Sequence, residues 1–131
     1  MKDLLWDEFQ ESVNENLVHN RSILDVLSKL HDSTSRVHRA IVKAVTSCGC
    51  IQIHAEKPRL PDNISLRDLK HYMDDHIQGQ LCSNCREVVE EELGRILFYM
   101  AALGNAVDVN IYDVLIREQK KLSTLGIYHI S

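Results

Sequence analysis

Apolar residues recur at alternating intervals of four and three along most of this chain, which is the spacing of one face of an α-helix. Two such series are long and predict helices over residues 22–47 and 84–107. The first comprises Ile23, Leu27, Leu30, Thr34, Val37, Ile41 and Ala44, and the second comprises Val89, Leu93, Ile96, Met100, Leu103 and Val107. Two apolar seams of this length favour packing of the two helices on each other.

Two shorter helices are predicted towards the ends of the chain. Over residues 3–18, helical spacing relates the apolar residues Leu5, Trp6, Phe9, Val13 and Leu17. Further along, Asn110 precedes Asp113 by three residues, which is the form of a capping box at the start of a helix. This last helix is expected to end at Ser123.

The segment between the two long helices is predicted to be less regular. Residues 51–64 contain both prolines of the chain and are expected to form a loop, since the alternation at Ile51-Gln52-Ile53 is very short. Ser65 and Asp68 form a second capping box, which opens a short helix ended by Gly79. No alternating run is long enough to predict a sheet.

Together these elements predict an all-α protein with four main helices. A chain of 131 residues is the size of one domain, so residues 1–131 are expected to form a single helical domain, with residues 48–85 as an insert. The two long helices favour a bundle with antiparallel pairs. Four helices of unequal length leave apolar stripes uncovered, so a homodimer that completes the bundle is expected.

Charge and hydropathy then exclude some partners. The chain has 15 basic and 19 acidic residues and a formal net charge of −4, which provides no positive field for nucleic acid. Charged residues interrupt every apolar stretch before the roughly 20 residues that a membrane span needs. Acidic residues also occupy the N-terminal segment where a signal peptide would be apolar, so a cytoplasmic protein is expected.

Four cysteines occur as two close pairs, Cys48/Cys50 and Cys82/Cys85. The first pair ends one long helix and the second starts the other, so antiparallel packing would bring the pairs together. Four thiolates suit tetrahedral Zn²⁺, with Zn–S distances of about 2.3 Å. The sequence therefore predicts a structural zinc site that closes the insert into a small lobe. An iron–sulfur or redox role, free thiols and disulfides remain alternatives.

Histidines are a further source of metal ligands in the insert. His54 lies near Cys50, and His71 and His76 flank the predicted short helix. Any of these side chains could replace a missing thiolate. The competing interpretation is that they are ordinary surface residues.

The segment with the most suggestive chemistry is Glu90-Glu91-Glu92-Leu93-Gly94-Arg95-Ile96-Leu97-Phe98-Tyr99-Met100. It resembles a motif of the MazG-type nucleoside triphosphate pyrophosphohydrolases, in which Glu-x-x-Asp lies within Glu-Leu-Gly-Asp followed by apolar and aromatic residues. The sequence after this motif is also similar to that family, over Ala101 to Ala106, Asn110 to Leu115 and Glu118 to Lys121. The resemblance covers roughly residues 22–48 and 86–126.

The resemblance implies a MazG-like four-helix fold in which carboxylates of two facing helices hold Mg²⁺ for nucleotide hydrolysis. Glu92 matches the Glu of the later motif, but Arg95 replaces its Asp. The family's earlier Glu-Glu-x-x-Glu motif falls on Asp32, Ser33 and Arg36. Asp32 and Glu92 would thus be the remaining catalytic carboxylates. Because Arg cannot ligate Mg²⁺, the catalytic metal site is expected to be degenerate.

Three functional hypotheses follow. The first is a nucleotide-binding or regulatory relative in which Arg36, Arg39 and Arg95 bind phosphate through their guanidinium groups. The second is an active Mg²⁺-dependent pyrophosphohydrolase that uses carboxylates drawn from Asp32, Glu91, Glu92, Asp113 and Glu118. The third is a structural dimer without a ligand, in which the arginines and carboxylates form an internal ion network or ordinary solvated pairs.

Overall fold

The structure is a computed structural model that describes residues 2–126, with side chains from Leu4 onward. It is mostly helical, as the sequence predicts. Its elements in chain order are α1 (Lys2–Asn16), α2 (Ile23–Lys43), the π-helical turn η1 (Ala44–Cys48), β1 (Ile51–Ile53), α3 (Leu66–Leu69), β2 (Ile77–Gly79), α4 (Ser83–Val107) and α5 (Ile111–Leu125). None of the described helices is both long enough and apolar enough to cross a membrane.

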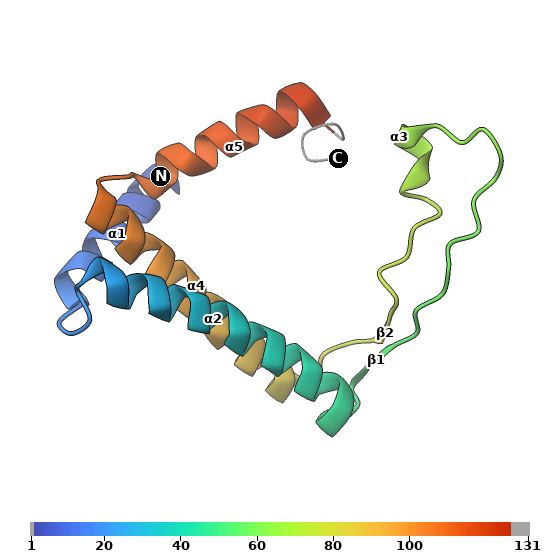
Figure 1. The fold of residues 1–131 in the computed structure, drawn as a ribbon, viewed down its shortest axis with the longest axis horizontal. Helices are drawn as coiled ribbons and strands as arrows, with labels where there is room; N and C mark the ends of the chain where they lie inside the picture. Colours follow the sequence, from blue (N-terminus) through green and yellow to red (C-terminus); the bar gives the residue numbers. More distant parts are fainter. Residues whose placement is uncertain (1, 127–131) are drawn as a thin grey trace.

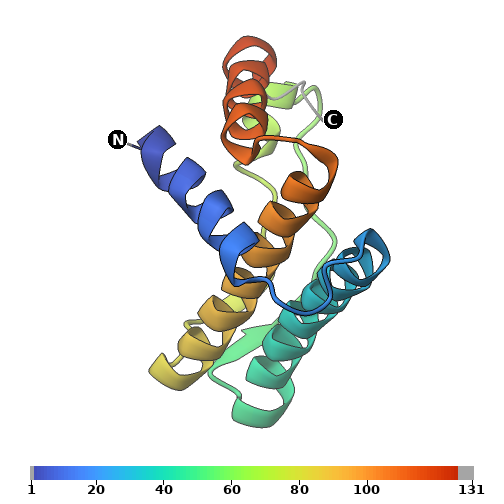
Figure 2. The same cartoon turned by 90° about the vertical axis from the view of Figure 1, so that its left-hand side faces the viewer.

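Helices α2 and α4 lie side by side and run in opposite directions (Figures 1 and 2), as their apolar seams predict. Val26 and Ser33 of α2 and Val89 of α4 are buried between the elements. The hydroxyl of Ser33 donates a hydrogen bond of 2.7 Å to the carbonyl oxygen of Lys29, so this buried polar group is satisfied within its own helix.

Helix α1 packs across the C-terminal half of α4 and completes the core. The buried centre consists of Val13, Val26, Ala101 and Ala102, with Phe9, Leu17, Phe98, Tyr99 and Leu103 packed partly against it. The small side chains of the two alanines allow both neighbouring helices to approach α4 closely.

The buried side chain of Gln10 joins α1 to the turn between α4 and α5 through two hydrogen bonds. Its Nε2 donates to the carbonyl oxygen of Val109 at 2.7 Å, and its Oε1 accepts from the backbone N–H of Ile111 at 3.0 Å. Gly104 provides the room for this contact, because a Cβ there would lie 2.6 Å from the Val109 oxygen and 2.8 Å from Gln10 Nε2.

The insert differs from the sequence prediction in two places. Residues 51–53, expected to be loop, form β1, which pairs antiparallel with β2 in the register Ile51↔Gly79, Gln52↔Gln78 and Ile53↔Ile77. The helix expected from Ser65 to Gly79 ends at Leu69. The alternation at Ile51-Gln52-Ile53 was too short to be decisive alone, and its strand forms because residues far along the chain pair with it.

The N-cap residues of both predicted capping boxes are confirmed. Ser65 Oγ accepts from the backbone N–H of Asp68 at 3.2 Å, and Asn110 Oδ1 accepts from that of Asp113 at 3.0 Å. The helix that Asn110 opens, α5, extends away from the α2–α4 pair and has no buried residue (Figure 1). The four-helix bundle expected from the sequence is therefore not confirmed within a single chain.

Candidate metal centre and arginine site

The four cysteines come together where the insert joins the helix pair. Cys48 is the last residue of η1, and Cys50 directly precedes β1. Cys82 is the N-cap of α4, and Cys85 lies in its first turn. The two pairs meet because α2 and α4 are antiparallel, which places the end of one helix beside the start of the other, as the sequence predicts.

The sulfur atoms form a compact group. All four Sγ atoms lie within 4.8 Å of one another, and Cys48 Sγ is 3.8 Å from Cys82 Sγ. A tetrahedral site with Zn–S bonds of about 2.3 Å has sulfur atoms about 3.8 Å apart. No disulfide joins the four, and each is a free thiol. The group can therefore hold a metal ion with little movement of its side chains.

Two glycines shape the backbone of the centre. Gly49 adopts a left-handed conformation with φ of 81°, and its N–H bonds to the carbonyl oxygen of Ala44 at 2.8 Å. This turn reverses the chain between Cys48 and Cys50. Gly79 has φ of 90°, and a Cβ there would lie 2.5 Å from the Cys50 carbonyl oxygen. Both conformations disfavour a larger residue.

The thiols of the second pair differ in acidity. The pKa of Cys82 is lowered to about 7, because its sulfur accepts a hydrogen bond from the backbone N–H of Cys85 at 3.4 Å and is stabilised by the Cys85 thiol. The pKa of Cys85 is raised to about 12, mainly because its thiol donates to Cys82 and also because of burial. The cluster thus carries an available thiolate near neutral pH.

The histidines of the insert do not join this cluster. His54 Nε2 lies 3.3 Å from Gln52 Oε1, and His71 is exposed. His76 has a buried Nδ1 without a hydrogen-bond partner among the described residues. The metal-ligand group found in the described part of the chain therefore consists of sulfur alone.

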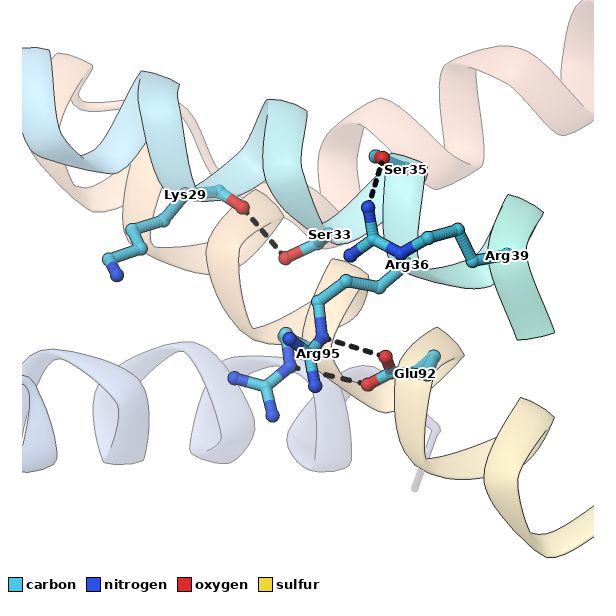
Figure 3. Close-up of polar contacts among 7 residues, drawn as sticks. All are labelled: Lys29, Ser33, Ser35, Arg36, Arg39, Glu92 and Arg95. Atoms are coloured by element: carbon cyan, nitrogen blue, oxygen red, sulfur yellow. Dashed lines mark hydrogen bonds and ion pairs between the residues drawn. The ribbon is translucent and has the colours of Figure 1, made fainter.

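The second site centres on Glu92, which is buried on α4 beside α2. Arg36 of α2 donates from Nε to Glu92 Oε2 at 2.7 Å, and Arg95 Nε lies 3.4 Å from Oε1 (Figure 3). The Glu92 side chain is 12% exposed, whereas those of Arg36 and Arg95 are 41% and 46% exposed. Each carboxylate oxygen of Glu92 thus faces a guanidinium group.

Arg39 lies apart from Glu92 in this arrangement. Its Nη1 donates to Ser35 Oγ at 3.1 Å, one turn earlier on α2 (Figure 3). A surface hollow of about 310 Å³ adjoins Glu92 and is lined by Arg36, Arg39, Ala40, Lys43, Val88 and Glu92. Arg36 and Arg39 thus line the same hollow. Arg95 pairs with Glu92 but does not line the hollow.

Lys43 is the charged residue of the hollow that was absent from the sequence prediction. It follows Arg39 by four residues and Arg36 by seven, so helical spacing places all three on one face of α2. That spacing is the signal that could have identified it. The hollow contains three cationic side chains and one carboxylate, in a chain that is acidic overall.

The other acidic candidates do not gather around Glu92. Asp32 and Glu91 are exposed and form no ion pair among the described residues. Asp113 and Glu118 lie on α5, which extends away from the helix pair (Figure 1). Ser33, where the resemblance led us to expect a carboxylate position, is buried and donates to the carbonyl oxygen of Lys29. The described structure therefore contains a single buried carboxylate between α2 and α4.

No protein-family model, curated protein or solved structure matches this chain in the three comparisons. The function proposed below therefore depends on the geometry of the cysteine centre and of the arginine site.

Proposed function

We propose that this protein binds a phosphate-bearing ligand, such as a nucleotide, in the hollow beside Arg36, and that a structural Zn²⁺ at the four cysteines stabilises its insert. In this proposal the protein is a binding or regulatory relative of the MazG-type pyrophosphohydrolases. The observation that carries the proposal is the pairing of Glu92 with Arg36 and Arg95 beside a hollow that two further cations line.

The hollow has the donors that a phosphate group requires. Arg36 uses Nε for Glu92, which leaves its two terminal nitrogens without a partner among the described residues. Arg39 is exposed, and the one side-chain partner it has among the described residues is the neutral hydroxyl of Ser35. Lys43 adds an ammonium group one turn further along α2. Guanidinium and ammonium groups together bind phosphate oxygens through charge-assisted hydrogen bonds.

The same geometry argues against hydrolysis that depends on Mg²⁺. A catalytic Mg²⁺ is held by carboxylate oxygens and water in a near-octahedral shell. Both oxygens of Glu92 already face guanidinium groups, and Asp32 is exposed outside this arrangement. A divalent cation at Glu92 would have to displace one of these ion pairs and would face the repulsion of two arginines.

Thermal denaturation with nucleoside triphosphates and with inorganic phosphate tests the binding proposal. We expect the melting temperature to rise with the triphosphates, and the rise to be the same with Mg²⁺ and with a chelator. The paired substitution Arg39→Ala and Lys43→Ala should remove the rise. Arg117→Ala and Lys120→Ala remove the same charge from α5, so this control variant should keep it. The absence of any shift in the unaltered protein would favour the purely structural hypothesis.

Pyrophosphate release from deoxynucleoside triphosphates tests the hydrolase alternative. With Mg²⁺ or Mn²⁺ we expect no turnover. Turnover that disappears in Glu92→Ala would instead establish the active pyrophosphohydrolase. A Glu90→Ala control, at an exposed carboxylate of the same helix, separates the role of Glu92 from a general effect of removing a carboxylate there.

Zinc is proposed for the cysteine centre because the donor set is four sulfurs that all lie within 4.8 Å of one another, and tetrahedral four-sulfur sites favour this metal. Elemental analysis of the purified protein should find one zinc per chain. The variant with Cys82→Ser and Cys85→Ser should lose it, whereas Ser83→Ala, between the same two positions, should retain it. Iron with inorganic sulfide in place of zinc would establish the iron–sulfur alternative.

A further inference from the structure

The hollow beside Arg36 and the cysteine centre share the same ends of α2 and α4. Lys43, which lines the hollow, is the last residue of α2 and precedes Cys48 by five residues. On the other wall of the hollow, Val88 follows Cys85 by three residues in α4. Figure 1 shows that both helix ends lie at the base of the insert. Each wall of the hollow is thus within about one and a half helical turns of a cysteine of the centre.

The turn η1 connects the two sites and has an unusual geometry. Its hydrogen bonds span five residues, as in the bond of 2.8 Å from the Gly49 N–H to the carbonyl oxygen of Ala44. Cys50 Sγ lies 3.9 Å from the same oxygen. Turns of this π-helical type are rare and occur frequently at functional sites. Ala44 is buried and directly follows Lys43, so the geometry of η1 also determines where Lys43 lies.

A metal at the cysteine centre would hold these helix ends together. It would join the cysteine pair after α2 to the cysteine pair at the start of α4. The side chain of Lys43 is exposed and forms no ion pair among the described residues, so its ammonium group is positioned through the backbone. Without the metal, both ends are free to fray, because the terminal turns of a helix are its least stable part. The hollow would then lose its ordered walls.

The charge of the metal centre acts in the opposite direction. A Zn²⁺ ion with four thiolates has a net charge of about −2, which repels a phosphate group. Nine residues separate Arg39 from Cys48, or about 13 Å along a helix axis. This separation exceeds the Debye length of about 8 Å at physiological ionic strength. Salt therefore screens most of the repulsion, and we expect the ordering of the hollow to dominate.

We propose that the cysteine centre regulates the phosphate site, in that a metal bound there raises the affinity of the hollow for phosphate groups by ordering η1 and the ends of α2 and α4. The coupling rests on the phosphate site and the zinc proposed above. Coupling between two binding sites is reciprocal, so a phosphate ligand should raise the affinity of the cysteines for zinc by the same factor. A chain that loses its metal would release its phosphate ligand more readily.

Calorimetric titration with deoxyadenosine triphosphate, without Mg²⁺, tests the coupling. The zinc-bound protein is compared with protein from which zinc and chelator have both been removed, under reducing conditions at an ionic strength of about 0.15 M. We expect the affinity to be at least about fivefold higher with zinc, which is the lower end of typical coupling between sites. The variant with Cys82→Ser and Cys85→Ser should have the low affinity at any zinc concentration. Ser83→Ala should respond to zinc as the unaltered protein does.

The outcomes separate the coupling from the two proposals on which it rests. Equal affinity with and without zinc would overturn the coupling and leave the phosphate site in place. Binding in neither form would overturn the phosphate site and the coupling with it, and a chain that takes up no zinc would overturn the metal and the coupling. Circular dichroism of the zinc-free protein is the control for folding. Loss of its helical signal would overturn a local coupling through η1, because the metal would then support the whole fold.

The reciprocal effect provides a second measurement on the same protein. In zinc-buffered solutions, the affinity of the cysteine centre for zinc should rise with deoxyadenosine triphosphate by the factor found in the titration. Arg39→Ala with Lys43→Ala should remove this rise, and Arg117→Ala with Lys120→Ala on α5 should keep it. A zinc affinity that does not respond to the triphosphate in the unaltered protein would overturn the proposal.

Discussion

Arg36 on α2 donates its Nε–H to Glu92 on α4 across the central helix pair, at a distance of 2.7 Å. The contact joins residues 56 positions apart in the chain. It compensates the charge of a carboxylate that is buried beside α2. The second partner of Glu92, Arg95, lies 3.4 Å away on the same helix as the carboxylate.

The two ion pairs should therefore differ in their contribution to stability. We expect Arg36→Ala to lower the free energy of unfolding by about 1–3 kcal/mol, because it leaves a buried carboxylate with one distant partner. Arg95→Ala should cost less than about 1 kcal/mol, as is usual for an exposed pair within one helix. Urea denaturation of both variants measures the difference, and equal losses would show that Glu92 does not depend on the contact between helices.

Gly104 is expected to be intolerant of even the smallest side chain. A Cβ there would lie 2.6 Å from the carbonyl oxygen of Val109, which the turn before α5 holds in place. Gly104→Ala should therefore destabilise the protein by about 1–3 kcal/mol. Gly94→Ala on the same helix is the matched control, because nothing lies within 4 Å of its Cβ position. That change should stabilise the protein by about 0.5–1 kcal/mol, and thermal denaturation of the two variants should give shifts of opposite sign.

The thiols of the metal-free protein should react with iodoacetamide at different pH. The pKa of Cys82 is lowered to about 7, so its reactive thiolate should accumulate as the pH rises through that value. The pKa of Cys85 is raised to about 12, so this thiol should remain protonated and slow under the same conditions. Mass spectrometry of peptides labelled between pH 6 and 9 identifies the residue. Faster labelling of Cys85 than of Cys82 at pH 7 would contradict the assignment of the thiolate.

Removal of the metal should loosen the insert more than the helices. A metal that joins the ends of the 31 residues between Cys50 and Cys82 closes a loop, which by the chain-entropy argument for crosslinks contributes about 3–4 kcal/mol. After chelation, hydrogen exchange should accelerate at β1 and β2 and change little around Val13. Uniform acceleration over the whole chain would instead show that the helical core requires the metal.

The sequence predicted the long elements and the meeting of the cysteines well, since both depend on strong local patterns. It predicted less well which face of α2 is buried. Ile23, Leu27 and Thr34 belong to the apolar seam but are exposed, whereas Val26 and Ser33 are buried. A wide apolar stripe leaves the rotation of a helix undetermined until its partners are known.

The arginine site was predicted in part. Arg36 and Arg95 meet at Glu92, as expected if the two helices face each other. Arg39 bonds to Ser35, and Lys43, which was not predicted as a site residue, lines the hollow. These differences depend on side-chain rotamers and on the helix partners, which periodicity does not specify.

The register of the small sheet has a consequence for how this chain can vary. Ile53 and Ile77 are direct partners, so their Cα atoms lie about 4.5–5.5 Å apart, a gap that a two-residue turn spans. The 23 residues between them therefore begin and end at the same place, the end of the small sheet near the cysteines. We therefore expect that the segment between Ile53 and Ile77 can be shortened to a two-residue hairpin turn, or replaced by another segment. Neither change should alter the spacing of α2 and α4.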